Sequence, residues 1–370
     1  MSERHITINI SSLLWILGAV LLLVLLWQLQ SLVVIFMVAI VIAATLAPAI
    51  TWAITHGIPR WLAVIGVYVG LLTVITVILL ELGPTVVTQV ERLLRKLPTY
   101  LDTLTILAEQ TAIRLGVTEP EAINLIERVL DLQGVTSWTF RSSQQLLVRS
   151  LGITRGLLGG VFSVFLALLF SGYMLSDSPR LIQGFVSLFP SPWDQRLAAQ
   201  VAPVSQRMGS YIQGRLLVST ILGVAISIGL LLVGIDEFAL SLGVIASVTN
   251  LIPFFGPVLG AIPALIVAVV QGGWVVLWVL LLFVVIQNIE TYVLDPLLVA
   301  PSVKVPPLYQ LLAVLGGVQL LGIIGALIAP PWVAGTAVLL ENLYLQPKAQ
   351  AQQPVLVESL SVQPGTERTQ

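Results

Sequence analysis

Cysteine is absent from the 370 residues of this chain, and histidine occurs only twice, at His5 and His56. A chain without cysteine forms no disulfide, no thiolate metal site and no cysteine nucleophile. The two histidines lie in a leader and in a loop, without the spacing of metal ligands. We therefore predict no metal site and no cofactor.

Charged residues are also scarce: they make up 9% of the chain, whereas ordinary globular proteins carry about 25%. Hydrophobic residues make up 57%, and the mean hydropathy is +1.01. The net charge of -1 provides no basic excess, so nucleic acid is not an expected partner. This composition predicts an all-α polytopic membrane protein whose main partner is the lipid bilayer.

The stretch from residue 216 to residue 340 is the poorest in charge. Its charged side chains are Asp236, Glu237, Glu290, Asp295 and Lys304. A charged group inside lipid is costly and usually marks function. The few polar groups of this stretch are therefore the first candidates for a functional site.

Four apolar runs precede this stretch, and most approach the length of about 20 residues that a helix needs to cross the hydrocarbon. They are Leu13–Trp27, Ser31–Ala53, Trp61–Leu82 and Leu151–Leu175. We predict N-terminal membrane helices within residues 1–83, the first two as a tight hairpin, and a further membrane helix at 151–175.

Residues 84–150 differ sharply from the apolar runs around them, because they carry seven basic and seven acidic side chains. Apolar positions recur there at intervals of three and four residues, which indicates amphipathic helices. We expect Gly83-Pro84 to end the preceding span and Pro98 to end the first amphipathic helix. A second helix is expected from Thr118-Glu119-Pro120-Glu121, which reads as a capping box. Residues 84–150 are thus predicted to be an extramembrane helical insert.

Residues 176–215 form a second polar stretch, with four arginines and two aspartates. The positive-inside rule places this linker in the cytoplasm, and counting spans then places the insert outside and both termini inside. The tail at 341–370 is rich in glutamine and proline and is predicted to be disordered.

Two long apolar segments in the 216–340 core are interrupted: Phe238–Gly272 and Pro307–Leu340. A continuous helix of 35 residues would be about 52 Å long, too long for one crossing and too short for two. A re-entrant hairpin or a helix broken near mid-membrane fits this length better. The expected hinge residues are Pro253, Gly256, Pro257, Gly322 and Gly325. Paired broken segments are typical of transporters built from repeats.

Four side chains in this core are candidates for ion coupling or transport: Glu290, Gln287, Asp295 and Asn250. Gln287 and Glu290 share one helix face with Thr291. A carboxylate at Glu290 could exchange a proton, or bind a cation together with Gln287. An interfacial glutamate that only reaches water would have the same sequence, so both interpretations stay open.

The chain resembles the autoinducer-2 exporter family of bacterial permeases through short motifs in the family's order. They are Tyr211-Ile212-Gln213-Gly214-Arg215, Asn250 to Pro257, Gln287-Asn288-Ile289-Glu290, Asp295-Pro296, Ser302 to Leu308 and Gly322-x-x-Gly325. Ala300-Pro301-Ser302 and Pro330-Pro331 depart from the family's usual residues. The resemblance implies a bacterial inner-membrane protein of about eight hydrophobic segments, which forms homo-oligomers. It also implies export of a signal molecule or sodium/proton exchange.

These observations favour a secondary transporter that exports a small solute or signal molecule, coupled to H⁺ or Na⁺ through Glu290. A gated channel would use the same broken helices. The alternative is a membrane scaffold that does not transport and acts through the 84–150 insert. An intramembrane enzyme is disfavoured, because the spans lack metal ligands, cysteine, histidine and a Ser-His or paired-aspartate arrangement.

Overall fold

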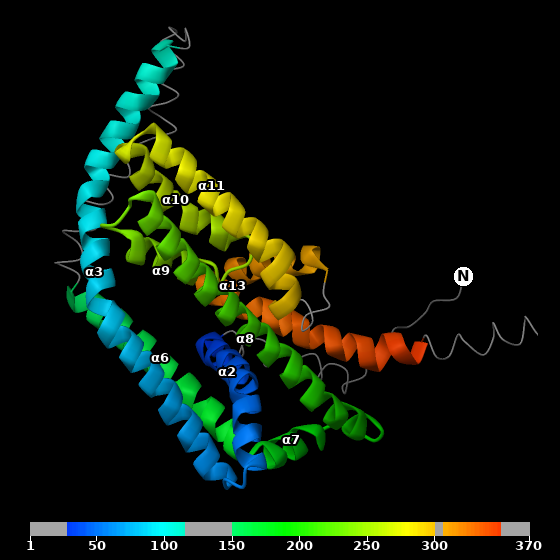
Figure 1. Ribbon diagram of the computed structural model, residues 1–370. Coiled ribbons are helices and arrows are strands. Elements are labelled where there is room, and N and C mark those ends of the chain that lie inside the picture. The colour runs from blue at the N-terminus through cyan, green and yellow to red at the C-terminus, as the bar shows by residue number, and fades with distance from the viewer. Residues whose placement is uncertain (1–27, 115–149, 300–305, 349–370) are drawn as a thin grey trace, which may run out of the picture.

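The computed structural model describes residues 28–114, 150–299 and 306–348, and every regular element in these ranges is a helix (Figure 1). The helices are α2 (Gln30–Thr55), α3 (Arg60–Arg114), α6 (Ser150–Ser176), α7 (Ser178–Val186), α8 (Trp193–Val233), α9 (Ala239–Thr249), α10 (Phe255–Gln271), α11 (Gly273–Ile289), the π-helix η1 (Glu290–Val299), α13 (Pro307–Leu340) and the π-helix η2 (Glu341–Leu345). Six helices within the described residues are long and apolar enough to cross a membrane. The predicted all-α polytopic membrane fold is confirmed.

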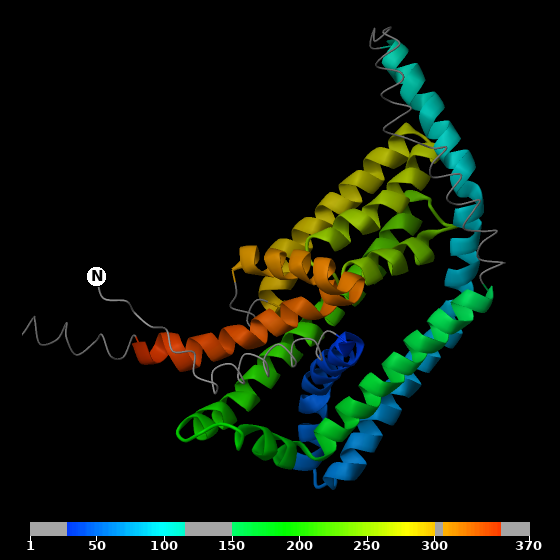
Figure 2. The same cartoon turned by 180° about the vertical axis from the view of Figure 1, so that it is seen from behind.

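The N-terminal half is a bundle of α2, α3 and α6 (Figures 1 and 2). Its small apolar core contains Ile50, Ala53, Ala63, Val64 and Leu175. Polar contacts also join the helices of this bundle: Arg60 Nε of α3 donates a hydrogen bond to the Leu175 carbonyl of α6 at 2.8 Å. Helix α2 lies between α6 and α8 and so joins this bundle to the rest of the molecule.

Helix α3 is longer than predicted, because it runs without interruption from Arg60 to Arg114 through Pro84 and Pro98. The expected helix end at Pro98 is therefore wrong, while the end of the membrane span at Gly83-Pro84 stays a prediction. A proline inside a helix removes one backbone hydrogen bond and its ring crowds the preceding turn, but α3 continues through both positions. We call residues 84–114 the α3 arm; the predicted second insert helix near Thr118 lies outside the described residues.

Helix α8 is the central rod of the C-terminal half. It begins at Trp193 and ends at Val233, where Gly234 adopts a left-handed conformation with φ of 95°. Such a residue is a common helix terminator. The predicted division between a polar linker at 176–215 and a membrane core from 216 therefore falls inside one continuous helix. Only the short helix α7 and the turn after it separate α8 from α6.

The first broken segment folds back on itself at Asn250–Phe254 and forms hairpin 1, which consists of α9 and α10. Helix α9 has 11 residues and α10 has 17, so at 1.5 Å per residue neither reaches the about 30 Å of hydrocarbon. Phe254 at the turn has φ of 67°, an unusual conformation for a large side chain. Gly260 of α10 packs directly against Ala246 of α9.

Helix α11 and the π-helix η1 then run back along α8 in the opposite direction. Gly229, near the end of α8, contacts Leu282 of α11, whereas Gly214 contacts Leu298 of η1. The chain thus returns to the end of the molecule at which α8 began.

The second broken segment, α13, also folds back and forms hairpin 2. Gly322 has φ of 64° and ψ of -146°, a combination that is essentially restricted to glycine. As a result Gly317 and Gly325 lie in direct backbone contact on either side of this turn. The two breaks predicted from proline and glycine are therefore confirmed.

The two hairpins point in opposite directions (Figures 1 and 2). Hairpin 1 leaves from the C-terminal end of α8, whereas the outgoing arm of hairpin 2 lies along its N-terminal half. There Arg207 contacts Glu341 at 3.0 Å, and Asn342 donates to Gln200 at 2.7 Å. Residues 341–348 are accordingly helical, contrary to the predicted disorder of the whole tail, because these polar contacts and the continuing helix hold them against α8.

Candidate functional site

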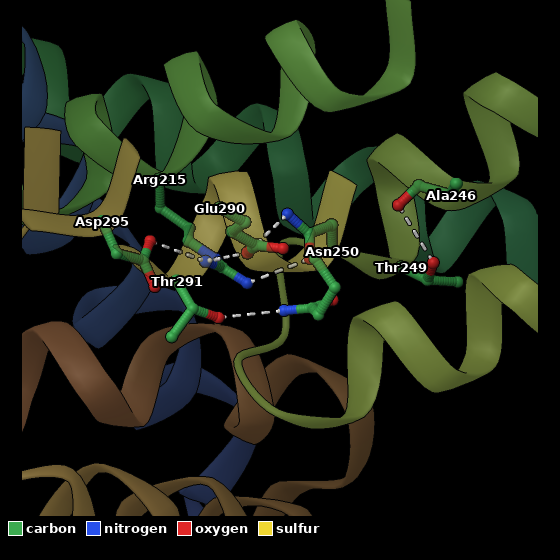
Figure 3. A network of polar contacts seen from close by, with 8 residues as sticks. Arg215, Ala246, Thr249, Asn250, Glu290, Thr291 and Asp295 are labelled. Carbon is green, nitrogen blue, oxygen red and sulfur yellow. Dashed lines mark hydrogen bonds and ion pairs between the residues drawn. The ribbon is translucent and has the colours of Figure 1, made fainter. Parts of the chain in front are cut away.

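Four polar side chains meet near the middle of α8 and form what we call the polar cluster: Arg215, Asn250, Glu290 and Asp295 (Figure 3). Arg215 Nη1 lies 2.9 Å from Glu290 Oε1 and 3.5 Å from Asp295 Oδ1. Arg215 Nη2 donates to Asn250 Oδ1 at 3.3 Å, and Asn250 Nδ2 donates to Glu290 Oε1 at 3.1 Å. One guanidinium thus joins α8, the turn of hairpin 1 and η1.

Gly214, the residue before Arg215, explains how η1 comes so close to α8. A side chain on Gly214 would overlap the carbonyl oxygen of Leu298. Small residues allow two helix backbones to approach in this way. Gly214 therefore lets η1 pack against α8, and this packing brings the carboxylates of η1 within reach of Arg215.

The π-helical geometry of η1 explains why two carboxylates face the same guanidinium. Glu290 and Asp295 are five residues apart, and a π-helix pairs residues i and i+5. In an α-helix the same spacing would turn the second side chain away from the first by about 140°. Pro296 lies inside η1 and cannot donate the α-helical hydrogen bond, which is consistent with the wider turn.

Burial divides the polar cluster into an inner and an outer part. Arg215, Asn250 and Glu290 are 5%, 3% and 3% exposed, whereas the Asp295 side chain is 39% exposed. Arg215 and Asn250 both bind Glu290 through its Oε1 atom, whereas Asp295 makes only the longer ion pair. If all groups are ionised, two carboxylates face one guanidinium and the cluster carries one excess negative charge.

Next to the polar cluster lies a cavity of about 1020 Å³. It is lined by α8 (Tyr211, Arg215), hairpin 1 (Pro253, Phe254, Pro257, Val258, Ala261, Ile262, Leu265), α11 and η1 (Phe283, Val284, Gln287, Glu290, Thr291, Asp295, Pro296, Val299) and the start of hairpin 2 (Pro306, Pro307, Gln310). Most of this lining is apolar, with a few convergent polar groups, as in typical small-molecule sites.

Two buried polar atoms of cavity-lining residues have no hydrogen-bond partner within the described residues, namely the Tyr211 hydroxyl and Arg215 Nε. Asp295 Oδ1 has only its 3.5 Å ion pair with Arg215. Buried polar atoms are nearly always paired with protein or water. Unsatisfied atoms gathered around one cavity are therefore consistent with a polar ligand or water bound there.

The predicted site residues are only partly brought together. Gln287 borders the cavity and donates to Thr291 at 3.4 Å, while Glu290 is held by Arg215 and Asn250 instead. The hinge residues Pro253 and Pro257 line the cavity, and Gly256 lies between Pro257 and the turn.

Gly322 and Gly325 lie in hairpin 2, outside the cavity lining. Sequence reasoning missed the pairing of Arg215 with Glu290, although it singled out both residues. The available signal was the position of Arg215 directly before the apolar core that contains Glu290, since charges within a membrane usually pair.

Comparison with known proteins agrees with this architecture. The profile of the AI-2E family transporters matches residues 13–344. "Putative transport protein YrrI" of Bacillus subtilis is 29% identical over 309 residues, which cover 82% of this chain and 83% of the relative. "AI-2 transport protein TqsA" of Escherichia coli is 26% identical over 317 residues, covering 84% and 86%. The chain therefore belongs to the AI-2E transporter family and is a multi-pass membrane transport protein.

Proposed function

We propose that this protein is a secondary transporter that moves a small solute through the cavity beside the polar cluster, coupled to a monovalent cation or proton at Asp295. The observation that carries the proposal is one guanidinium facing two carboxylates at the wall of a cavity between two oppositely directed hairpins. Each part of this arrangement has a role in the transport cycle.

The two hairpins support alternating access. Each half of the C-terminal core is a long helix followed by a hairpin, α8 with hairpin 1 and α11–η1 with hairpin 2. The two long helices run in opposite directions, so the halves have inverted topology. Transporters of this kind place the substrate between their repeats and expose it to each side by moving one against the other.

The charge balance of the polar cluster supports cation coupling. The excess negative charge is expensive in a site of low dielectric constant, and a bound Na⁺ or a proton would neutralise it. Asp295 is the better exchanging group, because Glu290 is occupied by Arg215 and Asn250. This moves the coupling role from Glu290, as predicted from the sequence, to Asp295, and leaves Glu290 to hold Arg215 in place.

The family suggests the first solute to test. A relative described as an AI-2 transport protein makes AI-2 a reasonable first candidate for export. The four arginines of residues 176–215 support a cytoplasmic position for that end of the molecule, and with it the proposed cytoplasmic location of both termini.

The test is a flux measurement on purified protein in proteoliposomes. A sodium gradient is imposed and the internal pH is recorded for the wild type, Asp295→Asn and Glu290→Gln, with Asp236→Asn as a control for an exposed carboxylate outside the polar cluster. We expect a sodium-driven pH change in the wild type and the control that Asp295→Asn abolishes. Coupling that persists in Asp295→Asn would overturn the assignment. Absence of any flux, including flux of AI-2, would favour the scaffold acting through the 84–150 insert.

A further inference from the structure

The α3 arm contacts the base of hairpin 1 through one face. Gln89, Leu93 and Lys96 follow each other at intervals of four and three residues, so they lie on the same side of the helix. All three face the segment that leads into α9: Gln89 contacts Ser241, and Lys96 contacts Glu237 and Phe238. Figure 1 shows α3 passing beside the start of α9.

The contact from Gln89 caps the start of α9. The Gln89 side-chain oxygen accepts a hydrogen bond from the Ser241 backbone N–H at 2.8 Å. Ser241 is the third residue of α9, whose first N–H groups have no partner within the helix. Phe238, the residue that precedes α9, provides no capping side chain. The Gln89 side chain, on another helix, therefore takes the place of a local N-cap residue.

The contact from Lys96 fixes the loop in front of α9. Lys96 Nζ lies 2.6 Å from Glu237 Oε2 and 5.4 Å from the centre of the Phe238 ring. Between the two polar contacts, Leu93 is 6% exposed and belongs to the same apolar core as Phe238. The α3 arm thus holds the hairpin base at a cap, an apolar anchor and an ion pair.

We propose that Gln89 and Lys96 are positioning residues that set how far hairpin 1 reaches toward the polar cluster. We call the contacts of Gln89, Leu93 and Lys96 the clamp. Helix α9 is a single rod of 11 residues, about 16 Å long, between this clamp and Asn250. A displacement of the α3 arm is therefore passed along α9 to the Asn250 side chain and to the wall of the cavity. The extramembrane insert is coupled to the transport site in this way.

The position of the hairpin can be measured without transport. The chain has no cysteine, so Phe254→Cys, at an exposed position of the turn that lines the cavity, provides a single thiol. Its rate of modification by a water-soluble maleimide reports how accessible the turn is. The inference rests on the proposed function because it takes the cavity as the transport site. The modification rate itself can be measured whether or not the protein carries ions or solutes.

Charge reversal separates positioning from general damage. In the Phe254→Cys background, Lys96→Glu and Glu237→Lys should each change the modification rate by about five-fold, and the double reversal should restore it, because contacting residues couple energetically. Gln89→Met, which keeps the length but removes the acceptor, should act in the same direction. Arg95→Glu is the matched control, since Arg95 pairs with Glu91 of its own helix.

The exposed Lys96–Glu237 pair should add little to overall stability, so the melting temperatures of the single reversals should stay near that of Arg95→Glu. Modification rates equal to that of Arg95→Glu, or a double reversal that does not restore the rate, would overturn the proposal. Loss of flux with an unchanged modification rate would also overturn it, while leaving the proposed transport function intact.

Discussion

At the scale of single residues, Arg215 organises the site. From α8, its guanidinium binds two carboxylates of η1 and one amide at the turn of hairpin 1. A buried ion pair contributes little net stability, because desolvation of both charges offsets their attraction, but removing one partner is strongly destabilising. This balance agrees with the role that we propose for the pair in the transport cycle.

This reasoning predicts the outcome of a double-mutant cycle. Arg215→Met should destabilise the protein by about 3–5 kcal/mol, because it leaves the Glu290 carboxylate buried without its partner. Arg215→Met combined with Glu290→Met should cost clearly less than the sum of the two single substitutions. Unfolding in detergent, followed by circular dichroism, measures all three variants, and additive losses would contradict the prediction.

The sequence identified the residues of the polar cluster but not their pairing. Arg215 and Glu290 are 75 residues apart, and hydropathy assigns Arg215 to a cytoplasmic linker because other arginines and aspartates precede it. Only the depth of α8 in the fold, and the close approach allowed by Gly214, place the guanidinium among buried groups. Neither quantity can be read from local composition.

At the scale of elements, the position of a proline did not decide by itself whether a helix ends. Pro84 and Pro98 lie inside α3, whereas the turn at Asn250–Phe254 breaks its segment. The difference lies in what receives the freed polar groups. At the turn of hairpin 1, the backbone N–H of Ile252 donates to the Thr249 carbonyl and that of Gly256 donates to the Ile252 carbonyl. The broken backbone is therefore supported within the turn itself.

Hairpin 2 offers a matched test of how closely its two arms pack. A side chain at Gly317 would overlap the backbone of Gly325, whereas one at Gly316 would meet nothing within 4 Å. Gly317→Ala should therefore destabilise the protein by about 1–3 kcal/mol through overpacking. Gly316→Ala should be neutral or slightly stabilising, since alanine favours the helix. Equal melting temperatures for the two variants would argue against the folded-back hairpin.

At the scale of the whole molecule, the hairpins determine the membrane topology. Because α8 crosses once, hairpin 1 returns to the side from which it enters and α11–η1 crosses back, Lys304 should face the cytoplasm, on the same side as the loop at His56. A single complete crossing by the first broken segment, in place of a re-entrant hairpin, would instead place Lys304 outside.

The absence of native cysteine makes this prediction easy to measure. Lys304→Cys should react with a membrane-impermeant maleimide in inside-out vesicles and be protected in intact cells. His56→Cys is the control for the cytoplasmic side. Labelling of Lys304→Cys from outside, with His56→Cys protected, would show that the segments cross completely.

The broad architecture was predictable because composition, segment length and the placement of proline and glycine each act locally. The oppositely directed hairpins and the clamp from the α3 arm were not, since they depend on contacts such as Lys96 with Glu237, which are 141 residues apart.

The π-helical geometry of η1 beside Arg215 also sets the size of the movement that a change of helix type would produce. Converting its wide turn to α-helical geometry would advance the following residues by one position, a rotation of about 100° and a shift of about 1.5 Å. Asp295 would leave the guanidinium, and the end of η1 that contacts Gly214 would rotate against α8. Release of the outer carboxylate and rotation of η1 against α8 would then occur in a single step.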